Sequence, residues 1–236
     1  MKAIAAVLIF AVVGCGGSFK RSSTAPAQPA VTVPVQSAIV FVGDSIFGRL
    51  AIDPVFKNFG FIDAGIFGQR TDQLLAVFPD VLSGKNVCHG FVPPQGQPPD
   101  ATFPFECSSL PVPPKTVVIF AGWNNFFQNN PGNTALDDLQ KMADLAQAQN
   151  VKVIICTLYA FDPGHPASWM VPTGSSPVTF YDVWRIPLND GIKAMRGVTV
   201  VDLDAVFSAE ILYTTDGVHP TDDGNAQMLN AIIPKI

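Results

Sequence analysis

The chain is poor in charge: Asp, Glu, Lys and Arg make up 14% of its 236 residues, against 48% hydrophobic residues. Such a composition folds around an apolar core, which excludes intrinsic disorder for the main part of the chain. Basic residues are also scarce, because no cluster exceeds the pair Lys20 and Arg21 and the net charge is −5. Nucleic acid needs a positive surface, so we expect no nucleic-acid partner. The length is that of one domain.

The apolar run near the N-terminus, residues 3–13, is too short to span a bilayer. It predicts a signal peptide over residues 1–14. The run ends in Val12-Val13-Gly14-Cys15, which resembles the lipobox of bacterial lipoproteins, and an ordinary secretory signal is the alternative. We expect an exported, membrane-anchored lipoprotein on the periplasmic or surface side. Residues 15–37 would be the lipidated Cys15 and a flexible tether.

Only four cysteines are present. Cys156 lies in an apolar run, so we expect it to be buried and inert. Cys88 and Cys107 flank a proline-rich segment and suit a disulfide in an oxidising compartment. A metal site is the alternative, but only His89 offers another ligand nearby. We therefore predict a disulfide, no metal site and no cofactor.

Five apolar runs alternate with stretches of helical periodicity. The runs are continuous, which is typical of strands that helices cover on both faces. This alternation predicts an α/β fold, a flavodoxin-like three-layer sandwich with a five-stranded parallel sheet. We expect strands at 38–42, 60–65, 116–121, 151–158 and 198–202. We expect helices at 71–82, 135–148, 180–195 and 222–233.

Two segments, 84–114 and 160–178, interrupt this pattern, and we expect no regular element in either. Irregular segments of such length are functional lids or mobile loops, and composition leaves both open. The expected organisation is one domain over 38–236 that carries a proline-rich insertion at 84–114.

Polar residues follow the ends of four predicted strands. "VGDS" (42–45) ends the first strand and "GIFGQRT" (65–71) follows the second. "GWNN" (122–125) and "DGVHP" (216–220) follow the third and the last. Because the carboxyl ends of parallel strands share one edge of a sheet, we expect these motifs to converge there.

These residue types suit acyl transfer. A serine hydroxyl such as that of Ser45 needs a base to take its proton, and His219 fits that role. Asp216 lies three residues before His219 and would orient the ring. The Asn124 amide and the backbone at Gly68 would donate hydrogen bonds to an oxyanion. Each residue alone also has a structural explanation, such as a turn, a helix cap or a loop amide.

The four motifs resemble, in order and position, the sequence blocks of the SGNH hydrolases, which are GDSL-type esterases and lipases. The resemblance spans about 38–234. It implies that Ser45 is the nucleophile, His219 the base and Asp216 its orienting carboxylate. It also implies that Gly68 and Asn124 complete an oxyanion hole with the Ser45 N–H. Ser45 does not lie in a G-x-S-x-G elbow, which argues against the α/β-hydrolase fold.

Two features depart from the family pattern. Asn125 stands where the family usually has Asp, which affects how the loop of Asn124 is held. The insertion at 84–114 is longer than the expected connection and would cover or reshape the acyl site. Four apolar neighbours are candidates for the walls of an acyl pocket or for packing at the sheet edge: Phe47, Phe67, Trp123 and Phe126.

The resemblance implies a serine esterase that hydrolyses carboxylic esters through a Ser-His-Asp acyl-enzyme mechanism. Expected substrates are short-chain acyl or acetyl esters, including acylated carbohydrate. The other expected partner is the membrane, reached through the N-terminal lipid. Two alternatives remain, an acyltransferase on envelope glycans and a non-catalytic glycan-binding envelope lipoprotein, and the intact Ser45, Asp216 and His219 argue against the second.

Overall fold

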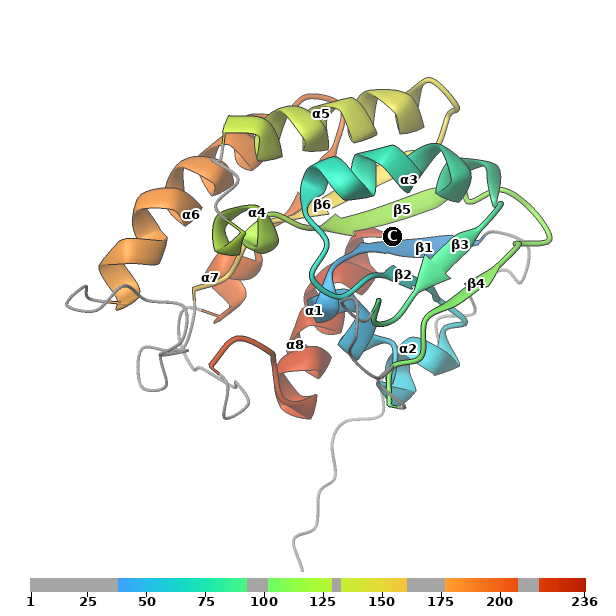
Figure 1. Cartoon of the computed structure of the whole chain (residues 1–236), viewed down its shortest axis with the longest axis horizontal. Helices are drawn as coiled ribbons and strands as arrows, with labels where there is room; N and C mark the ends of the chain where they lie inside the picture. Colours follow the sequence, from blue (N-terminus) through green and yellow to red (C-terminus); the bar gives the residue numbers. More distant parts are fainter. Residues whose placement is uncertain (1–37, 93–101, 129–132, 161–176, 208–216) are drawn as a thin grey trace, which may run out of the picture. The chain divides into compact units, whose positions relative to one another are not determined.

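A five-stranded parallel sheet runs through the centre of the molecule (Figure 1). The computed structural model describes residues 38–92, 102–128, 133–160, 177–207 and 217–236. The strand order is β2-β1-β5-β6-β7, which confirms the predicted five-stranded parallel sheet. The strands are β1 Ile39–Gly43, β2 Ile62–Gly65, β5 Thr116–Phe120, β6 Lys152–Cys156 and β7 Thr199–Val201.

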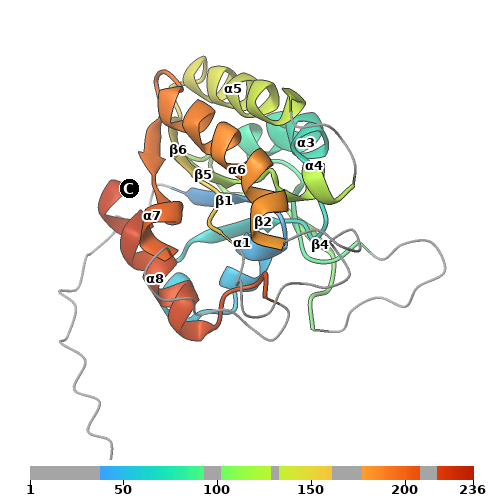
Figure 2. The ribbon, with the colours of Figure 1, turned by 90° about the vertical axis from the view of Figure 1, so that its left-hand side faces the viewer.

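Helices cover both faces of the sheet, so the predicted three-layer arrangement is confirmed. Figures 1 and 2 show α3, α5 and α6 over one face and α2, α7 and α8 over the other. Every residue of β1 and β5 is buried, as continuous apolar strands between two helical layers must be. The helices are α1 Ser45–Leu50, α2 Pro54–Asn58, α3 Thr71–Ser83, α4 Trp123–Phe127, α5 Asn133–Gln147, α6 Pro177–Ala194, α7 Leu203–Phe207 and α8 Asp222–Ile232, followed by the 3-10 turn η1 Ile233–Lys235.

The four helices expected from periodicity correspond to α3, α5, α6 and α8. Three others, α2, α4 and α7, are each five residues long, which is too short for an apolar period to show in the sequence. α4 begins directly after β5 and carries Asn124, so one of these short helices helps to form the site.

The insertion at 84–114 contains regular structure, and the expectation of none was wrong. Its strands β3 Val87–His89 and β4 Glu106–Ser108 pair antiparallel, with Cys88 opposite Cys107. The two cysteines form a disulfide, and Cys156 is a buried free thiol whose pKa burial raises above its usual range. Strands of three residues leave no readable period, and each needs a partner 19 positions away to form at all. We call residues 87–92 and 102–108 the disulfide hairpin.

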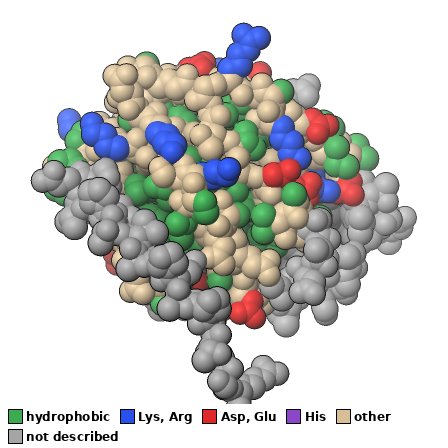
Figure 3. Space-filling view, turned by 180° about the vertical axis from the view of Figure 1, so that it is seen from behind, with side chains coloured by type: hydrophobic (Ala, Val, Ile, Leu, Met, Phe, Trp, Pro, Cys, Tyr) green, Lys and Arg blue, Asp and Glu red, His purple; other side chains and the backbone are tan. Residues whose placement is uncertain are grey.

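Several expectations fall outside the described residues: the signal peptide, the tether with Cys15, Asp216 and most of the segment at 160–178. None of the helices within the described ranges combines the length and apolar character needed to cross a bilayer. The same ranges contain no group of three or more His, Cys, Asp or Glu side chains placed to hold a metal ion. Figure 3 shows the back of the molecule, where Lys and Arg side chains are spread across the face rather than gathered in one patch.

Candidate active site

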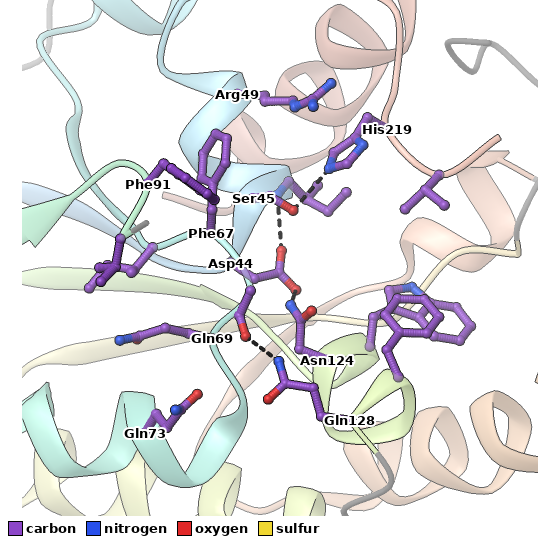
Figure 4. A pocket seen from close by; sticks show the side chains of 17 residues that line it. Asp44, Ser45, Arg49, Phe67, Gln69, Gln73, Phe91, Asn124, Gln128 and His219 are labelled. Carbon is purple, nitrogen blue, oxygen red and sulfur yellow. Dashed lines mark hydrogen bonds between the residues drawn. The ribbon is translucent and has the colours of Figure 1, made fainter. Parts of the chain in front are cut away.

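A cleft of about 610 Å³ opens where β1, β2 and β5 end. Ser45, Gly68, Asn124 and His219 all line it, so the structure brings together the predicted catalytic and oxyanion-hole residues that it describes. Figure 4 shows Ser45, Asn124 and His219 in this cleft. The other lining residues are Asp44, Ile46, Arg49, Ile66, Phe67, Gln69, Gln73, Phe91, Val92, Trp123, Phe127, Gln128 and Val218. The convergence follows from topology, because parallel strands deliver their carboxyl ends to one edge.

Ser45 and His219 are in hydrogen-bond contact. Ser45 is the first residue of α1, and its Oγ lies 2.9 Å from His219 Nε2. With its proton on Nδ1, the histidine accepts at Nε2 and the serine hydroxyl donates, as a nucleophile and its base require. The contact joins two residues 174 positions apart in the chain.

The position of His219 depends on a buried tyrosine that sequence reasoning missed. Tyr159 follows β6 in the chain. Its hydroxyl donates a hydrogen bond of 3.0 Å to the carbonyl of Val218, the residue before His219. The Tyr159 ring is fully buried between Phe120 and Phe207, with ring centres 5.6 Å and 4.6 Å away. A tyrosine after an apolar strand gives no sign in the sequence of which carbonyl it will reach. Asp216 lies outside the described residues, so its part in orienting His219 stays a prediction.

Asp44 has two roles at the site. Its Oδ1 accepts the N–H of Ile46 at 2.9 Å, which caps the N-terminus of α1. Its Oδ2 accepts the Asn124 Nδ2 amide at 3.1 Å, a contact that the sequence did not reveal. The side chain is only 1% exposed, and burial raises the pKa of Asp44 to about 7 against the opposing effect of these donors. Asp44 therefore fixes the Asn124 amide beside Ser45.

The backbone of Gly68 is held by a hydrogen bond from Gln128. Its φ of +75° lies in the left-handed region, while an added Cβ would meet nothing within 4 Å. The backbone conformation, rather than lack of space, is thus the reason for glycine at this position. Gln128 Nε2 donates to the Gly68 carbonyl at 2.6 Å, and Arg70 donates to Gln128 Oε1 at 2.8 Å. Because Gln128 directly follows α4, this contact ties the Gly68 loop to the helix that carries Asn124.

Asn125 fills the position where the resemblance led us to expect a carboxylate. It is fully buried, and its Oδ1 accepts the Thr71 N–H at 2.9 Å. Its Nδ2 donates to Thr71 Oγ1 at 2.7 Å, and that hydroxyl donates to Asp138 Oδ2 at 2.9 Å. The chain of bonds joins α4 to α3 and α5, so Asn124 stays anchored without the family's carboxylate.

The apolar walls of the cleft differ in part from the expectation. Phe67 and Trp123 line it, but Phe47 is buried in the core against Phe41, and Phe126 is not among the lining residues. Phe47 lies on the side of α1 that faces the core. The sequence alone does not show which side of this short helix faces the core and which faces the cleft. Phe91 and Val92 of the disulfide hairpin also line the cleft, which the sequence did not show. Other apolar lining residues are Ile46, Ile66, Phe127 and Val218.

Several solved structures of other proteins share this fold. A protein from Bacteroides fragilis that is named as an acylhydrolase is 24% identical, with a TM-score of 0.62 over 86% of this chain and 88% of that one. A GDSL-like lipase from Bacteroides thetaiotaomicron is 23% identical, with a TM-score of 0.58 over 89% and 90%. An acetyl xylan esterase is 21% identical, with a TM-score of 0.53 over 84% and 99%. The TM-scores show that the fold is shared, and at identities this low the likeness shows the fold alone.

The family of the chain is shown by its sequence rather than by its fold. No curated protein sequence matches the chain. Residues 41–227 match the sequence profile of the GDSL-like lipase/acylhydrolase family, a span that includes Ser45, Gly68, Asn124 and His219. The match covers most of the chain and nearly all of the sheet and its helices. The chain therefore belongs to the GDSL-like lipase/acylhydrolase family.

Proposed function

We propose that this carboxylic ester hydrolase works through an acyl-enzyme formed on Ser45. The observation that carries the proposal is the 2.9 Å contact between Ser45 Oγ and His219 Nε2 at the floor of an open cleft. His219 takes the hydroxyl proton as Ser45 Oγ attacks the ester carbonyl, and then gives that proton to the departing alcohol. Water, activated by the same histidine, releases the acid. Asp216 has the role of stabilising the histidine once it is protonated.

The negative oxygen of the tetrahedral intermediate needs donors that are already in place. In our proposal these are the backbone N–H groups of Ser45 and Gly68 and the second N–H of the Asn124 amide. Asp44 occupies one amide hydrogen of Asn124, which orients the other. The bond from Gln128 to the Gly68 carbonyl fixes the peptide plane next to the Gly68 N–H.

We propose short-chain acyl or acetyl esters with a hydroxyl-rich alcohol, such as acylated carbohydrate, as the substrates. Amide side chains support this choice, because Gln69, Gln73 and Gln128 lie together on the side of Asp44 away from His219 (Figure 4). Amides both donate to and accept from hydroxyl groups. Among the described residues, no hydrogen-bond donor reaches the buried Gln69 Oε1. One protein with the same fold is named as an acetyl xylan esterase, and an acetyl ester of xylan is an ester of this kind.

The test is hydrolysis of p-nitrophenyl acetate and of acetylated xylan by the purified protein and by Ser45→Ala. We expect the variant to lose at least about 1,000-fold in kcat, as when a member of a catalytic triad is removed. The matched control is Ser83→Ala, which removes an exposed hydroxyl on α3 that donates to the Asp80 carbonyl. Ser45→Ala activity within tenfold of the unchanged protein would refute Ser45 as the nucleophile.

We also propose export and anchoring through lipid on Cys15. The lipobox-like residues before Cys15 support the proposal, as does the Cys88–Cys107 disulfide, a kind of bond that persists in oxidising compartments. Cys15→Ala should leave the protein in the soluble fraction after cell lysis. If the variant stays with membranes through a carbonate wash, the lipid anchor is refuted.

A further inference from the structure

The disulfide hairpin is attached to the loop that carries Gly68. Gly90 lies just past β3, and its N–H donates to the Gly65 carbonyl at 2.9 Å. The Gly90 carbonyl accepts the Phe67 N–H, also at 2.9 Å. Gly90 and Ile66 thereby form a parallel bridge that extends the hairpin along the loop after β2. Two backbone bonds thus fix where the hairpin meets the cleft.

Close packing on the other side of Gly90 fixes the hairpin further. A side chain at this position would collide with the Pro104 carbonyl, and the φ of +102° also favours glycine. His89 Nδ1 lies 3.4 Å from Asp63 Oδ2, which links β3 to β2. The Cys88–Cys107 bond holds the two strands together one residue before His89. The hairpin is therefore held at its backbone, at a side chain and by a covalent bond.

The residues that follow Gly90 form an apolar wall of the cleft. Phe91 and Val92 line the cleft beside Phe67, which Figure 4 shows for the two phenylalanines. The Phe91 N–H donates to the Phe103 carbonyl at 3.1 Å, so the Phe91 backbone is part of the hairpin pairing. The Phe67 ring centre lies 6.3 Å from that of Phe91 and 4.7 Å from that of Phe103. The wall is built from two chain segments that the hairpin brings into register.

We propose that Phe91 is a specificity-determining residue that selects an acyl group of several carbons, butyryl to hexanoyl, over acetyl. The proposal rests on the proposed function. The amides of Gln69, Gln73 and Gln128 lie together in one part of the cleft, and Phe67, Phe91 and Val92 form an apolar wall in another. Two apolar residues of α4, Trp123 and Phe127, also line the cleft. The hydroxyl-rich alcohol fits the amide side, which leaves the apolar wall for the acyl chain. Methylene groups lose contact with water when they lie against this wall, while an acetyl group has none to offer.

The test compares p-nitrophenyl acetate with p-nitrophenyl hexanoate for the full chain, Phe91→Ala and Phe105→Ala. We expect the unchanged protein to prefer hexanoate in kcat/KM, and Phe91→Ala to raise KM for hexanoate about tenfold at unchanged kcat. That factor corresponds to lost contact with about two methylene groups. The KM for acetate should rise by a smaller factor than the KM for hexanoate. Phe105→Ala removes a phenylalanine on the same hairpin that is 45% exposed and does not line the cleft, so both esters should be unaffected.

A second variant guards against a folding defect in the first. Val92 is 49% exposed, so Val92→Asp leaves the core intact while it places a charge on the wall. It should weaken hexanoate turnover more than acetate turnover. The inference would be overturned if each of the two variants, Phe91→Ala and Val92→Asp, changed the kinetics of acetate and hexanoate by the same factor, or changed neither. Hydrolysis that depends on Ser45 would still stand in that case. A protein that hydrolyses neither ester would refute the proposed function together with the inference.

Discussion

Asn125→Asp tests how the site is anchored, because it restores the carboxylate that the family usually has at this position. In the structure, Thr71 Oγ1 has one proton and gives it to Asp138, while Asn125 Nδ2 donates to the same oxygen. A carboxylate at position 125 cannot donate, so two acidic groups would compete for the single hydroxyl proton. One buried oxygen would then lack a donor.

An unsatisfied buried polar group costs about 2 kcal/mol. For a domain of about 200 residues this corresponds to a fall in Tm of roughly 6 °C. The loss should depend on pH, because the introduced carboxyl is buried near Asp138 and its pKa would lie above that of the unfolded chain. Below that raised pKa the group is protonated and donates as the Asn125 amide did, so the loss shrinks as pH falls.

The assay is thermal unfolding followed by circular dichroism at pH 8 and pH 4.5. Asn125→Ala removes the same bonds without adding a titrating group, so its loss should be equal at the two pH values. Asn58→Asp adds the same charge at an exposed position at the end of α2 and should change Tm little. If Asn125→Asp melts with the unchanged protein at pH 8, or loses as much at pH 4.5 as at pH 8, the hydrogen-bond reasoning is refuted.

Three further predictions concern the same structure. Asp44→Asn should lower kcat about 100-fold, because Asn still caps α1 but turns an N–H toward the Asn124 amide; unchanged kcat would show that Asn124 needs no such acceptor. Because burial raises the pKa of Asp44 to about 7, the folded protein binds a proton there between about pH 4 and pH 7 that the unfolded chain has released. The unfolding free energy of the unchanged protein, measured in urea relative to that of Asp44→Asn, should therefore rise as pH falls through this range. Over the same range kcat/KM should fall. A difference in unfolding free energy that does not change with pH would count against the raised pKa. Replacing both Cys88 and Cys107 by Ser should lower the unfolding free energy by about 3 kcal/mol, as expected for a loop of 19 residues; a loss below about 1 kcal/mol would mean that the hairpin is held without the bond.

The sequence by itself determined the sheet and the four longer helices. Strands such as β1 and β5 are buried on both faces, so nearly every residue is apolar and the run is visible without knowledge of its neighbours. Helices α3 and α5 repeat their apolar residues with the helical period, which is a local property of the chain. The carboxyl ends of parallel strands lie at the same edge of a sheet. The meeting of four residues in one cleft could therefore also be predicted from the sequence: Ser45, Gly68, Asn124 and His219.

Tertiary structure decided which groups each side chain meets. Asp44 caps α1 with one oxygen, and its second oxygen accepts from Asn124, which is 80 positions away. Tyr159 reached the Val218 carbonyl across 59 positions, and Gln128 reached Gly68 across 60. Such bonds depend on rotamers and on the spacing between packed elements, and neither leaves a period in the sequence.

The disulfide hairpin shows the same division most clearly. The sequence offered Cys88 and Cys107 as a pair, because two cysteines around a proline-rich segment suit a disulfide in a chain that is expected to be exported. It did not show the strands of three residues, or that Gly90 pairs with the loop before Gly68. Pairing is a relation between two backbones rather than a property of one segment, so the apolar wall of the cleft exists only in the folded molecule.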